Sequence, residues 1–78
     1  MTQWEYCILA QAPSGPLLIT LTYYTPQGGK STQHRAESYE DGLNRLWPQF
    51  VAELGREGWE LVAIDTGAWY FKRPLQEG

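Results

Sequence analysis

The segment from Gly28 to Thr32 is the first stretch of this chain whose residue types could do chemistry. It ends in Gly-Lys-Ser-Thr, like a phosphate-binding loop, in which backbone N–H groups surround the phosphates and the lysine neutralises them. The complete motif needs a further glycine at the position that Tyr24 occupies here. A helix should also begin at Lys30 and point its N-terminal donors at the anion, but no apolar stripe follows. We therefore interpret the segment as the tip of a hairpin.

The triplet Asp65, Thr66 and Gly67 resembles the active-site turn of retroviral-type aspartic proteases. In those homodimers two such aspartates share a proton and activate water. That fold places the turn early and builds its substrate walls from the long chain that follows, whereas only residues 69–78 remain here beyond Ala68. Asp-Thr-Gly is also a common tight turn, since Asp bonds its own backbone and Gly takes a positive φ. We interpret the triplet as a turn without catalytic residues.

His34 has one other soft metal ligand in the chain, Cys7, with which it could also form a nucleophile pair. A metal site needs three or four suitable ligands, and a Cys–His nucleophile pair needs a third group to orient it. We expect His34 to be a solvated side chain, and we predict no catalytic residue, no metal ligand and no cofactor. Because the chain has one cysteine, it cannot form an internal disulfide, which indicates a reducing compartment.

Length and charge restrict the class of protein further. Seventy-eight residues predict one small domain that spans residues 1–78. The net charge of −3 and pI near 4.9 argue against nucleic-acid binding, which needs a basic patch. The chain shows neither a basic start followed by an apolar run nor an apolar run near the ~18 residues of a membrane span. We therefore predict a cytoplasmic domain without membrane contact.

Alternating side chains predict two strands at the beginning of the chain, over residues 4–11 and 17–24. The turn-forming residues Pro13, Ser14, Gly15 and Pro16 separate them, which favours an antiparallel hairpin. The pair Gly28-Gly29 predicts a second turn, and residues 30–35 a short polar edge strand.

One helix is predicted in the middle of the chain. Ser38 followed by Asp41 resembles a capping box at its beginning. The apolar stripe consists of Leu43, Leu46, Trp47, Phe50, Val51 and Leu54. Pro48 lies inside the stripe and removes a backbone donor, so we expect a kink there. If Gly58 ends the helix in the left-handed conformation, Leu54 and Trp59 form the hydrophobic pair of a Schellman-type cap.

Two further strands are predicted over residues 59–66 and 68–73. Pro74 should end the second strand, and residues 75–78 should form a frayed tail. The prediction is therefore an α+β fold: an antiparallel sheet of four or five strands, made of two hairpins, with one kinked helix packed on one face. The order is strand, strand, optional third strand, helix, strand, strand.

Three motifs carry a resemblance to a known family. They are Trp4-Glu5-Tyr6, the segment Glu-Gly-Trp-Glu-Leu-Val at residues 57–62, and Phe-Lys-Arg-Pro at residues 71–74. The chain resembles a small bacterial family known as the domain of unknown function number four-one-seven-seven. The resemblance implies a compact α+β domain with two hairpins flanking a helix, and it implies no activity. The long excursion over residues 17–35 departs from the family pattern and is interpreted as an added hairpin.

The distribution of apolar residues suggests a function. We expect the inward set to be Trp4, Trp47, Trp59, Leu61, Ala63, Trp69 and Phe71. We expect a second apolar set to face the opposite way and to form an interface, namely Cys7, Leu9, Leu18, Val62, Ile64 and Tyr70. A single helix covers one face of a sheet, and an exposed apolar face marks an interaction site.

The sequence therefore predicts a non-enzymatic interaction or assembly module that forms a homo-oligomer, either a dimer or a larger ring, or binds another protein. The alternative is a small-ligand or phosphate-binding protein, or an enzyme. Such a protein would use the segment from Gly28 to Thr32 or a pocket between subunits.

Overall fold

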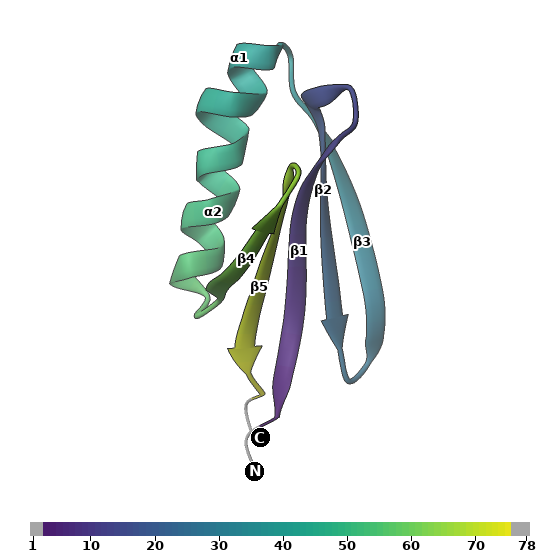
Figure 1. Cartoon of the computed structure of the whole chain (residues 1–78), viewed down its shortest axis with the longest axis vertical. Coiled ribbons are helices and arrows are strands. Elements are labelled where there is room, and N and C mark those ends of the chain that lie inside the picture. The colour runs from purple at the N-terminus through teal and green to yellow at the C-terminus, as the bar shows by residue number, and fades with distance from the viewer. Residues whose placement is uncertain (1–2, 76–78) are drawn as a thin grey trace.

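The computed structural model describes residues 3–75 and has one antiparallel sheet with a helix along one face (Figure 1). The elements are β1 (Trp4–Ala12), β2 (Gly15–Thr25), β3 (Gly28–Arg35), α1 (Tyr39–Asp41), η1 (Gly42–Leu46), α2 (Trp47–Arg56), β4 (Glu60–Asp65) and β5 (Ala68–Pro74). The five strands lie in the order β3-β2-β1-β5-β4, so β1 is central and β3 and β4 are the edges. The predicted α+β fold, with its third strand, is confirmed. Residues 76–78 of the predicted tail lie outside the described residues.

The second hairpin turns earlier than the glycine pair indicated. Thr25 pairs with Gly28, so Pro26 and Gln27 form the tip. Proline is favoured at the first central position of a turn because its φ is already suitable. Gly28 has a φ of 114° and begins β3, and Gly29 pairs with Tyr24 inside the ladder. The turn prediction at Gly28-Gly29 is wrong by two residues, because proline determines the turn.

The helix begins at the predicted cap and continues through the proline. The Ser38 hydroxyl accepts a hydrogen bond from the Asp41 N–H at 3.0 Å. Just before Pro48 the helix widens into the π-helical segment η1, where the Trp47 N–H donates to the Gly42 carbonyl. A proline cannot donate to the preceding turn and its ring crowds that turn, so a wider turn accommodates it. The α1, η1 and α2 segments therefore form one helix from Tyr39 to Arg56.

The π turn also changes which residues face the sheet. It inserts an extra residue into the turn and so rotates the preceding residues relative to the rest of the stripe. Leu43, the first member of the expected stripe, is 56% exposed. Gly42 is buried instead, and a Cβ on this residue would overlap the Pro16 carbonyl oxygen. The apolar stripe begins at Leu46, three residues later than expected.

The end of the helix agrees with the prediction in detail. Gly58 has a φ of 89°. The Trp59 N–H donates to the Leu54 carbonyl at 2.9 Å, and the Gly58 N–H donates to the Gly55 carbonyl at 3.1 Å. These two bonds define a Schellman motif. Leu54 and Trp59, its hydrophobic pair, are both buried in the core.

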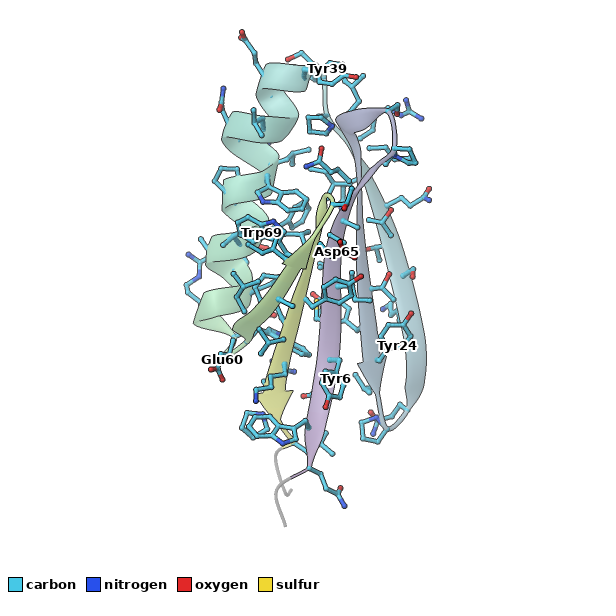
Figure 2. The ribbon with its side chains drawn as sticks, viewed as in Figure 1. Tyr6, Tyr24, Tyr39, Glu60, Asp65 and Trp69 are labelled. Atoms are coloured by element: carbon cyan, nitrogen blue, oxygen red, sulfur yellow. The ribbon has the colours of Figure 1, made fainter. Side chains whose placement is uncertain are left out.

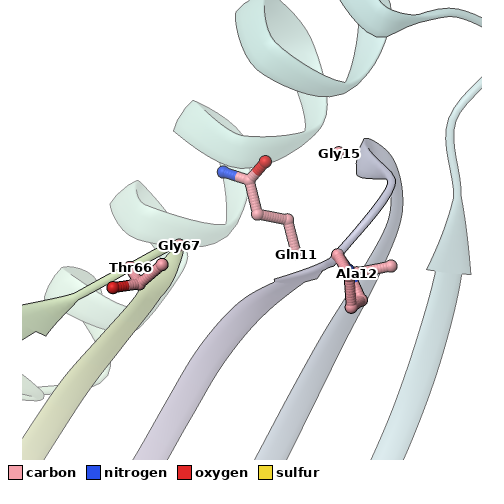
Figure 3. A pocket seen from close by; sticks show the side chains of 6 residues that line it. Gln11, Ala12, Gly15, Thr66 and Gly67 are labelled. Carbon is pink, nitrogen blue, oxygen red and sulfur yellow. The ribbon is translucent and has the colours of Figure 1, made fainter.

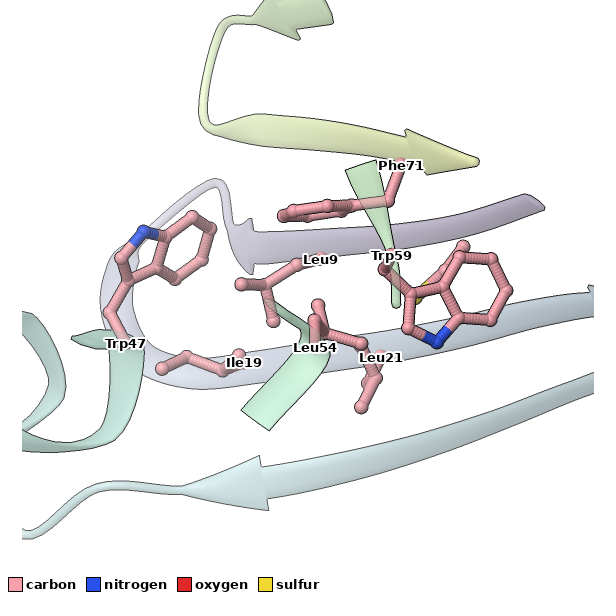
Figure 4. Packing of buried hydrophobic residues seen from close by; sticks show 8 residues of the cluster. Leu9, Ile19, Leu21, Trp47, Leu54, Trp59 and Phe71 are labelled. Carbon is pink, nitrogen blue, oxygen red and sulfur yellow. The ribbon is translucent and has the colours of Figure 1, made fainter. Parts of the chain in front are cut away.

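The core fills the space between the helix and the sheet (Figure 4). Its buried members are Cys7, Leu9, Ile19, Leu21, Trp47, Leu54, Trp59 and Phe71. Cys7 and Leu9 are 0% exposed, so the prediction that they belong to an outward interface is wrong. Their strand β1 is inverted relative to the expectation: Trp4 and Tyr6 face away from the helix and are exposed.

An ion pair explains why β1 is inverted. Glu5 lies on the same face as Cys7 and Leu9. A charged residue on a strand face favours the prediction that the face is exposed to solvent. Glu5 is nevertheless only 8% exposed, because the Arg73 guanidinium on β5 donates to its carboxylate at 2.7 Å. Arg73 also covers the Trp59 ring at 4.3 Å and donates to the Glu57 carbonyl. A buried carboxylate with a bonded partner is tolerated in a core, whereas an unpaired one is not.

Strand β4 departs from simple alternation. Leu61 pairs with Phe71 and Ala63 with Tyr70, so the ladder shifts by one residue at Val62. A bulge of this kind reverses the alternation beyond it. Ala63 therefore shares the face of Tyr70, and Ile64 shares that of Trp69, which reverses the prediction for both.

No helix within residues 3–75 combines the length and the apolar character needed to cross a membrane.

Candidate functional site

The side of the sheet opposite the helix presents a row of large side chains that no element within residues 3–75 covers. We define the open face by its apolar and aromatic members: Trp4, Tyr6, Ile8, Leu18, Tyr24 and Tyr70. Directly paired residues share a face, and Tyr6 pairs with Tyr24 on one side and with Lys72 on the other. Ile8 similarly lies between Thr22 and Tyr70. The open face is therefore a continuous surface across β2, β1 and β5.

The aromatic side chains of this surface are accessible. Trp4 is 37% exposed, Tyr6 49% and Tyr24 52%. Figure 2 shows Tyr6 and Tyr24 side by side on neighbouring strands. The ammonium of Lys72 lies over the Trp4 ring, 4.1 Å from its centre. This is a cation–π contact, in which the negative face of the ring attracts the positive charge. These rings would lose substantial contact with water if another surface covered them.

Charge is placed mainly at the margins of the open face. Arg35 pairs with Leu18 at the β3 edge, and Glu60 pairs with Lys72 at the β4 edge. The central positions carry Ile8, Thr22 and Tyr70. Aromatic and apolar groups in the middle with charged groups at the rim are typical of surfaces that bind proteins.

The six residues predicted as an interface divide among three places. Leu18 and Tyr70 lie on the open face, as predicted. Cys7 and Leu9 lie in the core. Val62 and Ile64 belong to the edge strand β4, where they are 47% and 59% exposed. The structure brings Trp4, Tyr6, Ile8 and Tyr24 to the open face, and the alternation within β1 had already grouped the first three.

The glycine-lysine segment does not have the geometry of a phosphate loop. Residues Gly28 to Thr32 lie in β3, and the next helix begins at Tyr39. The phosphate alternative therefore lacks the helix N-terminus that its chemistry requires.

His34, further along β3, does not project freely into solvent. Its ring packs on Phe50 with centroids 4.7 Å apart, and its Nε2 lies 3.1 Å from the Thr32 hydroxyl. It is half-buried, so the expectation of a solvated side chain is wrong.

The Asp-Thr-Gly triplet is a hairpin turn, as predicted. Asp65 pairs with Ala68, and the two residues between them have positive φ values, 37° for Thr66 and 79° for Gly67. Two-residue turns with positive φ at both central residues match the twist of a hairpin.

The turn borders a cleft of about 480 Å³ at one end of the sheet (Figure 3). The cleft is lined by Gln11, Ala12, Pro13, Gly15, Thr66 and Gly67. None of these lining side chains is titratable, so they offer no general acid or base.

The single thiol is placed in an unreactive environment. Burial among apolar side chains raises the pKa of Cys7 from 9.0 to about 12, and the nearby Glu57 adds to the rise while Arg73 opposes it. A thiol with such a high pKa is protonated at neutral pH and is a poor nucleophile and metal ligand. Within residues 3–75 no three His, Cys, Asp or Glu side chains are close enough to hold a metal ion.

Comparisons of the chain with protein-family models, with curated proteins and with solved structures find no match. The resemblance to the four-one-seven-seven family therefore stays a prediction that rests on its three motifs.

Proposed function

We propose that this protein is a non-enzymatic assembly module whose copies associate through the open face of the sheet. The observation that carries the proposal is the uncovered aromatic surface, with Tyr6 and Tyr24 each about half exposed at neighbouring positions. Exposed apolar surfaces of this kind on small domains mark binding sites.

The dimensions of the open face suit a second copy of the chain. Strand β1 has nine residues, which corresponds to a length of about 30 Å. With the polar rim that β3 and β4 add on either side, five strands about 4.8 Å apart span a width of about 24 Å. The resulting footprint of about 700 Å² is close to the roughly 800 Å² that each partner contributes to a standard interface.

A two-fold dimer is the simplest arrangement that covers this surface. In such a dimer the same patch is used on both copies, and each aromatic row packs against its equivalent. Two twisted sheets pack face to face about 10 Å apart with their side chains interdigitated. The net charge of −3 makes nucleic acid an unsuitable alternative occupant of the aromatic surface.

Sedimentation over a hundredfold range of concentration tests the proposal with the variant Ile8→Asp. Ile8 occupies the middle of the open face, so aspartate there would place an unpaired charge between the copies. We expect the wild-type chain to sediment as a dimer or larger species. Ile8→Asp should lose the open-face contact and sediment as a smaller species at each concentration while it still melts cooperatively.

The matched control is Leu43→Asp, which introduces the same charge at an exposed apolar side chain on the helix. It should assemble like the wild type. A monomeric wild type, or equal dissociation of both variants, would contradict the proposal.

A further inference from the structure

The two edges of the sheet carry opposite charges. Strand β3 contains Lys30 and Arg35 and no acidic residue, whereas β4 contains Glu60 and Asp65 and no basic residue. All four of these side chains are exposed. Each edge strand has one neighbour in the sheet, so each presents backbone donors and acceptors on its outer side.

Strand β4 is also unusually apolar for an edge. Leu61, Val62 and Ile64 are 41%, 47% and 59% exposed, and with Ala63 they line a shallow surface hollow. Proteins commonly protect edge strands with lysine or proline, and β4 has neither. A strand of this composition is suited to pairing with another strand.

Charge decides which strand can be its partner. If β4 paired antiparallel with β4 of another copy in the centred register, Glu60 would lie opposite Asp65. The same pairing of β3 with itself would set Lys30 opposite Gln33 and Arg35 opposite Gly28, so neither base would meet an acid. Like charges directly opposite each other destabilise a ladder, whereas opposite charges stabilise it. Pairing β4 with β3 places the acid Asp65 beside the base Arg35 on the open side of the sheet.

We propose that β4 of one copy pairs with β3 of the next copy, so that the sheet continues from one molecule into another. The topology makes this pairing parallel, because β3 and β4 both run in the direction of β1. A register that sets Asp65 beside Arg35 sets Glu60 beside Ser31, next to Lys30, because the bulge at Val62 shortens the β4 ladder by one position.

The pair formed by Asp65 and Arg35 is the specific one. Asp65 pairs with Ala68, which lies beside Ala10 on the open side of the sheet. Arg35 pairs with Leu18 on that same side. Lys30 lies on the helix side of β3, where it pairs with Tyr23, whereas Glu60 lies on the open side, so these two do not form a second pair.

This contact is head-to-tail, because it joins two different surfaces. Such contacts produce a ring when the rotation between copies closes and a filament when it does not. The edge contact is separate from the proposed contact through the open face, and each is expected to form without the other.

Charge reversal in an Ile8→Asp background tests the edge contact, because that background removes the open-face contact. When added to the Ile8→Asp parent, the single changes Arg35→Glu and Asp65→Lys should each raise the dissociation constant about tenfold. In each case one attractive cross-strand pair becomes repulsive. Two samples should recover association: the double variant with both reversals, and an equimolar mixture of the two single variants. Sedimentation velocity at low salt measures all four, and thermal melting verifies that each is folded.

The outcomes separate the two proposals. A parent that stays monomeric, single variants that associate as well as the parent, or a mixture that stays dissociated would overturn the edge contact. Stronger association of Asp65→Lys alone would favour β4–β4 pairing and would also overturn it. A different result would contradict the open-face proposal, namely that Ile8→Asp assembles as strongly as the wild type. If Ile8→Asp does not melt cooperatively, Tyr6→Asp on the same face replaces it.

Discussion

The two faces of the central strand β1 differ in a way that composition does not reveal. The face toward the helix carries Cys7 and Leu9, which are 0% exposed, and ends in a charged residue, Glu5. The opposite face carries Trp4 and Tyr6, which are more than a third exposed. The charged face is the buried one and the more aromatic face is the exposed one.

This difference shows that a charged side chain is buried when it has a bonded partner, even where an aromatic side chain on the same strand stays exposed. Glu5 enters the core because Arg73 neutralises it at 2.7 Å. Tyr6 stays outside, where water satisfies its hydroxyl and its ring remains available for contact. An exposed aromatic row beside a well-filled core is consistent with a surface kept for binding. The following predictions test the contrast between the two faces.

The largest effect is expected from Leu9→Asp. Leu9 is fully buried against the helix, so the variant would bury an unpaired charge in the core. The expected loss exceeds the ~3–5 kcal/mol that stabilises a domain of this size, so no cooperative unfolding transition should remain in a thermal melt followed by circular dichroism. Ile8→Asp, one residue away on the other face, should still fold. A cooperatively melting Leu9→Asp protein would show that the assignment of faces is wrong.

The next effect compares two tryptophans on opposite faces. Trp59 is 5% exposed, contacts Tyr23 and lies under Arg73, so Trp59→Ala should cost ~3–5 kcal/mol. Trp4 is 37% exposed, and Trp4→Ala should cost less than about 1 kcal/mol in the monomer. Urea unfolding of both variants at low protein concentration measures the difference. Equal losses would show that the open face contributes to the fold as much as the core does.

A smaller effect tests how closely the helix packs against the sheet face that it covers. A Cβ at Gly42 would overlap the Pro16 carbonyl oxygen, so Gly42→Ala should destabilise by ~1–3 kcal/mol through crowding. Gly55 is exposed in the same helix with nothing within 4 Å of such a Cβ, so Gly55→Ala should stabilise by ~0.8–1 kcal/mol. Opposite signs of the two changes in urea unfolding are the expected result, and equal signs would contradict the close approach at Pro16.

The last effect is negligible at neutral pH and grows only above pH 9. It concerns the buried thiol of Cys7, on the face of the sheet toward the helix. The unfolded Cys7 thiol ionises near 9.0, whereas burial holds its proton to about 12 in the folded chain. The folded state therefore binds more protons in this interval, and the free energy of unfolding should fall as the pH rises from 9 toward 12. Below pH 9 this contribution is complete.

Urea unfolding at pH 8 and pH 10.5 measures the fall, and Cys7→Ala is the control. Part of the fall should persist in the variant, because burial also raises the pKa of Tyr23. The same pH dependence in both proteins would show that the thiol is not desolvated.

Features that depend on neighbouring residues were predictable from the sequence. The helix cap at Ser38 and the Schellman motif at Gly58 each involve partners within five residues, so the local pattern contains all the information. The hairpin turn at Asp65 was predictable for the same reason. The two hairpins and the helix stripe followed from periodicity, except at η1, where Pro48 changed the helical register and moved Leu43 outward.

The assignment of side chains to faces required the tertiary structure. Alternation divided β1 into two sets, but either could face the helix until Glu5 met Arg73, which lies 68 residues further along the chain. In β4 the bulge at Val62 arises from pairing with β5 and moved Ala63 and Ile64 to faces opposite to those expected. The sequence determined by itself the elements, both ends of the helix and the presence of two apolar faces, because local geometry sets these. Only long-range pairing decided which face became the core and which stayed open, because the free energy of burying a charged or aromatic side chain depends on the partner it meets.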